Sequence, residues 1–126
     1  MSVFSIGELA YFAEPNHLGR LATVDDTGQP RIVPLGWRYN PDLDTIDIGG
    51  RDPAEFVATH KFRDVQRQPK VAFVVDDVLP PWQPRCVIVH GTADAIHTHA
   101  TAAGDDATAL IRITPTNVIS WGLPVE

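Results

Sequence analysis

The stretch His60–Lys70, HKFRDVQRQPK, leads directly into Val71–Asp76, VAFVVD. The first part holds four Lys or Arg residues against one Asp, in a chain whose formal net charge is −6. It has the character of a cationic helix that Pro69 ends. The apolar, β-branched run after it predicts a central strand rather than a half-exposed one. Positive charge concentrated in an acidic chain suggests a site for an anion, and phosphate is the natural candidate.

Length and composition limit the class of protein. A chain of 126 residues is expected to form one domain, residues 1–126, with a real core. Hydrophobic residues make up 44% and charged residues 21%, as in ordinary soluble proteins. The acidic balance argues against nucleic-acid binding, and one cysteine, Cys86, excludes an internal disulfide. Without a membrane-spanning run or a signal pattern, we expect a cytoplasmic protein with no membrane partner.

The chain before residue 50 is expected to form a short helix and a β-meander. Ser5 and Glu8 stand at capping-box spacing, which predicts a helix over residues 5–14. Alternating apolar residues between turn signals predict three strands, at residues 18–24, 30–39 and 45–49.

The central helix is expected to begin at Asp52-Pro53, a cap residue followed by proline at the first helical position. Ala58, Phe62 and Val65 fall at helical spacing and give it one apolar face. Three basic side chains are expected on its exposed face: Lys61, Arg63 and Arg67. A solvated helix face and an anion site both remain open as interpretations of this charge.

The remainder of the chain is dominated by strands. Residues 78–84 hold three prolines and are expected to be irregular. A long strand is expected over 85–96, a mobile loop over 97–107, and two last strands over 109–114 and 117–121. Six or seven strands with one central helix and no βαβ alternation predict a mainly β protein with short helices, an antiparallel barrel.

Two glycine-containing segments are candidates for contact with a ligand. Pro34-Leu35-Gly36-Trp37 interrupts the second strand, and such a break frees backbone groups that can bind a flat heterocycle. Gly49-Gly50-Arg51 ends the third strand, where paired glycines allow close approach and Arg51 adds a cation. A barrel corner and a tight turn would produce the same residues.

The sequence offers no obvious acid–base machinery. His97 and His99 alone make a poor metal site, so we expect no metal, and Cys86 in an apolar strand is expected to be an inert thiol. No nucleophile elbow, P-loop or GxGxxG occurs. If the protein is an enzyme, a bound cofactor therefore carries the reaction, and no catalytic side chain is assigned.

Several segments together resemble the pyridoxamine 5′-phosphate oxidase-like split β-barrel proteins. The similarity runs in order through most of the chain: 18–24, 28–36, 45–50, 61–65, 69–77, 84–91, 111–115 and 120–122. Within that superfamily the chain looks most similar to small enzymes that use the deazaflavin coenzyme F420. The turn at Tyr39-Asn40-Pro41, the pair Asp76-Asp77 and the ending Ser120-Trp121-Gly122 support this branch.

The resemblance implies a homodimer with two cofactor sites at the subunit interface, each lined by both chains. Lys61 then corresponds to the helix lysine that contacts the cofactor phosphate, with Arg63 beside it. Trp121 corresponds to an aromatic residue that reaches the site from the partner subunit. The resemblance places further residues around the cofactor: Arg31, Val33, Pro34, Leu35 and Gly36 along the ring system, Ile48, Gly49 and Gly50 beside the phosphate or ribityl chain, and Trp82 and Arg85 along the pocket wall.

Departures from the family pattern narrow the expected activity. True pyridoxamine phosphate oxidases have a lysine where Gly36 stands and a longer C-terminus, so vitamin B6 oxidation is not expected. The expectation is an F420-dependent oxidoreductase that transfers hydride to an unsaturated small organic substrate. An FMN-dependent oxidoreductase on the same fold and a non-catalytic flavin- or tetrapyrrole-binding protein are the alternatives.

Overall fold

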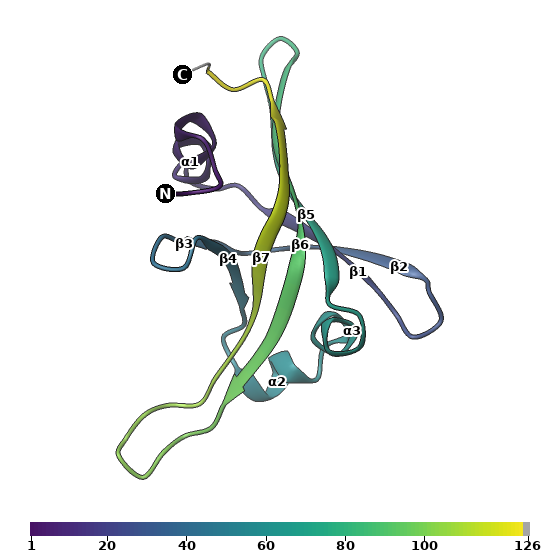
Figure 1. Ribbon diagram of the computed structural model, residues 1–126, viewed down its shortest axis with the longest axis vertical. Helices are drawn as coiled ribbons and strands as arrows, with labels where there is room; N and C mark the ends of the chain where they lie inside the picture. The colour runs from purple at the N-terminus through teal and green to yellow at the C-terminus, as the bar shows by residue number, and fades with distance from the viewer. Residues whose placement is uncertain (125–126) are drawn as a thin grey trace.

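A computed structural model describes residues 1–124 and shows one seven-stranded sheet with three short helices (Figure 1). Neighbouring strands pair antiparallel throughout, in the order β2-β1-β5-β6-β7-β4-β3. This confirms the predicted mainly β, antiparallel architecture. The elements are α1 Ile6–Phe12, β1 Gly19–Val24, β2 Pro30–Leu35, β3 Arg38–Asn40, β4 Thr45–Gly49, α2 Pro53–Val57, α3 His60–Arg67, β5 Lys70–Leu79, β6 Gln83–Thr98 and β7 Thr108–Trp121.

The sheet curls because its two edges are joined by only two residues. β2 and β3 stand at opposite ends of the strand order, yet only Gly36 and Trp37 separate them in sequence. The three Cα steps of that link span at most about 11 Å, so the edges must approach one another. The predicted break in the 30–39 strand is therefore the point at which the chain passes between the edges of a split barrel.

The core lies on the concave face of the sheet. Phe73 and Val75 on β5, and Val87 and Val89 on β6, are almost fully buried and face it. On β5 they alternate with partly exposed residues, as expected for a strand whose two faces have different surroundings. The apolar run after Pro69 thus forms a strand near the middle of the sheet, as predicted.

The cationic segment differs from the single helix that was expected. The helix does not continue through Thr59. The Thr59 side chain instead caps a new helix by accepting a hydrogen bond from Phe62 N at 3.4 Å. Two helices result, α2 and α3, and Ala58 is an exposed residue that ends α2 rather than part of an apolar face. Lys61 is half-buried rather than exposed.

The proline-rich segment is also more regular than expected. β5 continues to Leu79 and β6 begins at Gln83, so residues 78–84 form the end of a long hairpin. The prolines occupy its turn and the strand start, where a missing N–H is tolerated. The predicted strands 109–114 and 117–121 are one strand, β7, with a bulge opposite His90 and Gly91.

The N-terminal helix is shorter than expected, but its capping box is present. Glu8 N donates to the Ser5 hydroxyl at 3.1 Å, and Ser5 N donates to the Glu8 carboxylate at 2.8 Å. Both orphan donors of the first turn are thereby satisfied. None of the helices in residues 1–124 is long and apolar enough to cross a bilayer.

Candidate functional site

A hollow of ≈ 370 Å³ lies between β2 and the start of α3, and we call it the phosphate hollow. Its lining residues come from three elements and the α2–α3 link: Thr23, Arg31, Ile32, Val33, Thr59, His60 and Lys61. Since β2 is an edge strand, one side of its backbone has no strand partner in the described sheet. The hollow therefore combines unpaired backbone groups with two cationic side chains, as an anion site requires.

Lys61 brings a partly desolvated cation to the phosphate hollow. Its ammonium group lies 5.3 Å from the centroid of the Phe56 ring, and burial lowers the pKa of the amine below its usual value. Within residues 1–124 it forms no ion pair. A cation that is held against an aromatic ring without a carboxylate partner is well placed to bind an anion.

Arg31 is the second cation of the hollow, and carboxylates fix it in place. Its Nε lies 3.3 Å from Oδ2 of Asp64, and a terminal nitrogen lies 3.4 Å from Oδ2 of Asp25. Asp64 is fully buried and accepts a hydrogen bond of 2.8 Å from the Thr23 hydroxyl, whereas Arg31 Nε contacts it as an ion pair without hydrogen-bond geometry. A buried carboxylate is costly unless it is paired, so Asp64 and Arg31 depend on one another.

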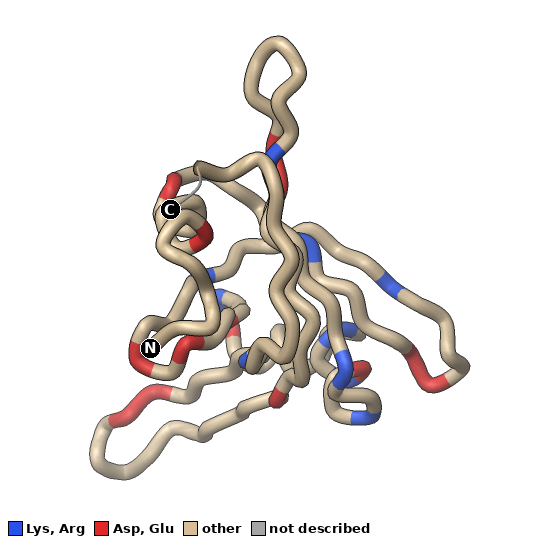
Figure 2. Tube along the Cα trace, turned by 45° about the horizontal axis from the view of Figure 1, so that its top comes forward, with Lys and Arg blue, Asp and Glu red and all other residues tan. Residues whose placement is uncertain are grey.

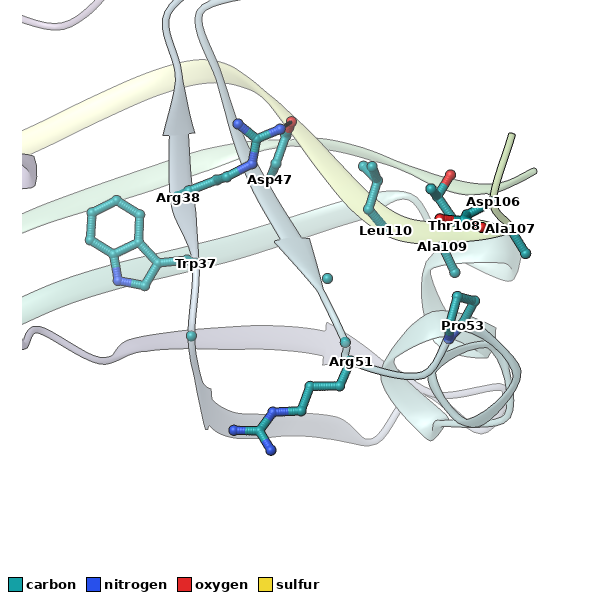
Figure 3. A pocket seen from close by; sticks show the side chains of 13 residues that line it. Trp37, Arg38, Asp47, Arg51, Pro53, Asp106, Ala107, Thr108, Ala109 and Leu110 are labelled. Carbon is teal, nitrogen blue, oxygen red and sulfur yellow. Dashed lines mark ion pairs between the residues drawn. The ribbon is translucent and has the colours of Figure 1, made fainter. Parts of the chain in front are cut away.

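A second hollow, of ≈ 650 Å³, lies where the chain passes from β2 to β3, and we call it the glycine hollow (Figure 3). It is lined by 13 residues: Gly36, Trp37, Arg38, Asp47, Gly49, Gly50, Arg51, Pro53 and residues 106–110. A Cβ at Gly36 would have no atom within 4 Å. The backbone at Gly36 is therefore open to a ligand, whereas a Cβ at Gly50 would meet the Phe56 side chain at 3.0 Å and one at Gly49 the Ala109 carbonyl at 3.5 Å.

Asp47 fixes the wall of the glycine hollow. It is 3% exposed, and its carboxylate accepts hydrogen bonds from Arg112 at 3.0 and 3.1 Å, Asn40 at 3.0 Å and Thr45 at 2.9 Å. A terminal nitrogen of Arg38 lies 3.5 Å from Oδ2 of Asp47. Burial by itself would raise the pKa of Asp47, but these hydrogen bonds outweigh it and hold the pKa below its usual value.

The two hollows are consecutive along the same chain segments. Residues 31–33 line the phosphate hollow and 36–38 the glycine hollow, while 49–53 and 59–61 supply the facing wall. Ile32 and Gly36 are four residues apart on an extended strand, which corresponds to about 13 Å. The predicted residues Arg31, Val33 and Lys61 line the phosphate hollow, and Gly36, Gly49 and Gly50 line the glycine hollow. Pro34 and Leu35 lie between the two groups in the sequence.

The remaining predicted site residues lie elsewhere in this chain. Ile48 is 1% exposed and belongs to the core, and Arg63 is exposed outside both hollows. Trp82 lies in the turn between β5 and β6, and Trp121 pairs with Cys86 near the same end of the sheet. Neither tryptophan lines the phosphate hollow or the glycine hollow.

Arg85 has its guanidinium engaged within the chain. It donates to Asp77 at 2.6 and 2.9 Å and to Glu14 at 2.9 and 3.0 Å, and it lies over the Tyr11 ring at 4.8 Å. These contacts fasten α1 to the sheet. The prediction that Arg85 lines the cofactor pocket gains no support from this arrangement.

Sequence reasoning missed the acidic residues that hold the cations. Asp64 was counted only as an offset to the local positive charge, although it stands beside Val65 at the margin of the apolar helix face. An aspartate at the margin of a buried helix face can itself be buried, and a buried aspartate almost always has a partner. Asp25 and Asp47 carried no such local signal, because their partners Arg31 and Arg112 are set by strand pairing and turn geometry.

Comparison with known proteins agrees with this architecture. Residues 6–122 match the family described as pyridoxamine 5′-phosphate oxidase. The chain is 38% identical over 123 residues to a 5a,11a-dehydrotetracycline/5a,11a-dehydrooxytetracycline reductase of Streptomyces rimosus, covering 95% of this chain and 84% of that protein.

Solved structures show the same fold at low sequence identity. A conserved hypothetical protein of Mycobacterium tuberculosis aligns with a TM-score of 0.71 at 20% identity, over 99% of this chain and 92% of that one. An F420 reductase aligns with a TM-score of 0.66 at 19% identity, over 92% of this chain and 98% of that one. An FAD-binding protein of Mycobacterium smegmatis aligns with a TM-score of 0.65 at 21% identity, over 96% of this chain and 97% of that one. Together, the family match and the seven-stranded split barrel show that this chain belongs to the pyridoxamine 5′-phosphate oxidase family.

Proposed function

We propose that the protein is a cytoplasmic F420-dependent reductase that acts on an unsaturated organic substrate. The observation that carries the proposal is Lys61, a half-buried cation that forms no ion pair within residues 1–124 and lines the phosphate hollow. The similarity to a reductase of dehydrotetracyclines supports the reaction class and suggests a polycyclic enone as substrate. The fold shared with an F420 reductase is consistent with the cofactor.

The residues present fit a cofactor that has a flat ring system at one end and a phosphate further along. Lys61 and Arg31 would bind the phosphate, and the backbone of residues 34–36 would hold the ring. Gly49 and Gly50, which line the glycine hollow, would lie beside the connecting chain. The chemistry supplied by the bound cofactor would be hydride donation to an electron-poor carbon–carbon double bond, with a proton from solvent completing the reduction.

An FMN-dependent oxidoreductase is the second candidate. The same residues would bind either cofactor, and FAD-binding proteins share the fold. A binding protein without turnover would use the same hollows as well. Turnover with reduced F420 separates these candidates.

We expect the protein to reoxidise reduced F420 under anaerobic conditions when a dehydrotetracycline-type enone is supplied, and to show no reoxidation without an acceptor. The absorbance of the oxidised deazaflavin follows the reaction, and a mixture without protein is the control. Stoichiometric F420 binding without turnover across quinones, enones and bilins would instead favour the non-catalytic candidate.

We also propose that the protein is a homodimer, because the outer face of the sheet carries aligned apolar side chains. Val74, Ile88 and Ile119 are directly opposite one another on β5, β6 and β7, and Ile119 is 40% exposed. Exposed apolar patches of this kind mark protein interfaces. We expect sedimentation equilibrium to give twice the chain mass of 13.8 kDa, and Ile88→Arg to give a folded monomer. A monomeric wild-type protein would contradict the dimer.

A further inference from the structure

The phosphate hollow contains two cations, but only one of them is free of carboxylates. Arg31 lies between Asp25 and Asp64, at 3.4 and 3.3 Å. Lys61 forms no ion pair within residues 1–124. Both carboxylates lie beside Arg31 and offset its charge, so Lys61 presents the uncompensated charge of this hollow to a ligand.

Asp25 is held in this position by its turn. Its Oδ1 accepts hydrogen bonds from Thr27 N at 2.8 Å, the Thr27 hydroxyl at 2.7 Å and Gln29 N at 2.9 Å. Its Oδ2 is thereby left to face Arg31. The hydrogen bonds from Thr27 and Gln29 lower the pKa of Asp25, so the carboxylate stays charged at neutral pH.

The neighbouring residue Asp26 is arranged differently. It is mostly exposed and lies 3.7 Å from Arg67, at the outer side of α3. Figure 2 shows the acidic turn between β1 and β2 and the basic residues gathered around α3. Asp25 and Asp26 therefore carry the same charge in the same turn, but only Asp25 contacts a residue of the hollow.

We propose that Asp25 and Asp64 tune the phosphate hollow to accept a singly charged phosphodiester and to disfavour a doubly charged phosphomonoester. This deepens the proposed function and rests on it, because the phosphate of F420 is a diester whereas that of FMN is a monoester. A monoester carries close to two negative charges at neutral pH, and a diester carries one. The second charge would lie near two carboxylates that already offset Arg31, and of the two Lys and Arg side chains that line the hollow only Lys61 is outside an ion pair in residues 1–124.

The selection would be a matter of repulsion as much as attraction. Both ligands gain the contact with Lys61, so that contact does not distinguish them. Discrimination between similar ligands commonly comes from an element that penalises the wrong one. Asp25 and Asp64 supply that element, and they also fix the guanidinium of Arg31 at the wall of the hollow.

The test uses two ligands that differ in this charge and in one methyl group: the 5′-phosphate of the deazaflavin–ribityl unit and the methyl diester of that phosphate. Their dissociation constants are measured at pH 7.5 by tryptophan quenching, with wild-type protein, Asp25→Asn and Asp26→Asn. Asparagine retains the acceptor oxygen that the turn requires, and Asp26→Asn removes the same charge from the same turn. Circular dichroism checks that each variant is folded.

We expect the wild-type protein to bind the diester more tightly than the monoester. Asp25→Asn should reduce that preference by about three- to tenfold, the size expected for one unit charge at this range in a partly solvated site. Asp26→Asn should leave the preference for the diester within about twofold of the wild-type value, because solvent screens an exposed charge. An unchanged preference in Asp25→Asn, or an equal change in Asp26→Asn, would overturn the proposal.

The proposed function has a separate outcome in the same experiment. Wild-type protein that does not bind F420 itself would contradict the F420 assignment. Wild-type protein that binds F420 but neither short ligand would place the affinity outside the phosphate hollow, and would overturn the charge-selection proposal alone.

Discussion

Replacing Lys61 with alanine is expected to raise the dissociation constant for F420 by about 10- to 100-fold, since a hydrogen bond to a charged group contributes about 1.5–3 kcal/mol. The lysine is half-buried and has no ion pair in residues 1–124, so no ion pair within that part of the chain has to be broken before it binds a phosphate. The fold should persist, because the ammonium group contacts only the Phe56 ring among the described interactions. Titration followed by tryptophan quenching measures the effect.

Arg63→Ala is the matched control for this measurement. It removes the same charge from the same helix, but Arg63 is exposed and lies outside both hollows. We expect its dissociation constant to stay within about threefold of wild type, as for an exposed charge screened by salt. Equal losses in both variants would show that the helix acts through its net charge. Unchanged affinity in Lys61→Ala would exclude Lys61 as the phosphate ligand.

Replacing Asp47 with alanine is expected to lower the free energy of unfolding by about 3–5 kcal/mol, the usual cost of removing one partner from a buried ion pair. The change leaves Arg112 without its hydrogen-bond acceptor and frees the side chains of Asn40 and Thr45. Urea unfolding followed by circular dichroism measures the loss. Asp94→Ala is the control, since Asp94 is opposite the same arginine but exposed, and we expect less than about 1 kcal/mol.

The destabilisation in Asp47→Ala should depend on pH in one direction. The folded protein holds the pKa of Asp47 below its ordinary value, so the unfolded chain takes up the proton first as the pH falls. The stability that Asp47 provides is fully present above about pH 4, the ordinary aspartate value, and is lost as the pH falls through the folded pKa. The difference between wild type and variant should therefore narrow in acid, and a constant difference would contradict this account of the network.

Local sequence patterns were sufficient for most of the fold. Proline and glycine at 34–36 marked the point where the chain leaves β2, and apolar alternation located the central strands. The predictions of secondary structure were wrong where a tertiary contact overrides a local sequence signal. Thr59 caps a second helix within what reads as one, and strand pairing holds the proline-rich segment 78–84 in a hairpin.

The candidate site was predictable only in part. Lys61, Gly36 and the Gly49-Gly50 pair are marked by composition and by family resemblance, and the structure places them in the linings of two separate hollows. The acids that hold the cations were not predictable, because Asp64 meets Arg31 through the packing of α3 on β1 and the register of β1 with β2. Such pairings depend on contacts far apart in sequence.

A direct titration of the wild-type protein with F420 and FMN tests whether the phosphate hollow and the glycine hollow together bind F420. We expect saturable quenching by F420 with one site per chain, and weaker binding of FMN. Tighter binding of FMN than of F420, or no saturable binding of F420, would contradict it.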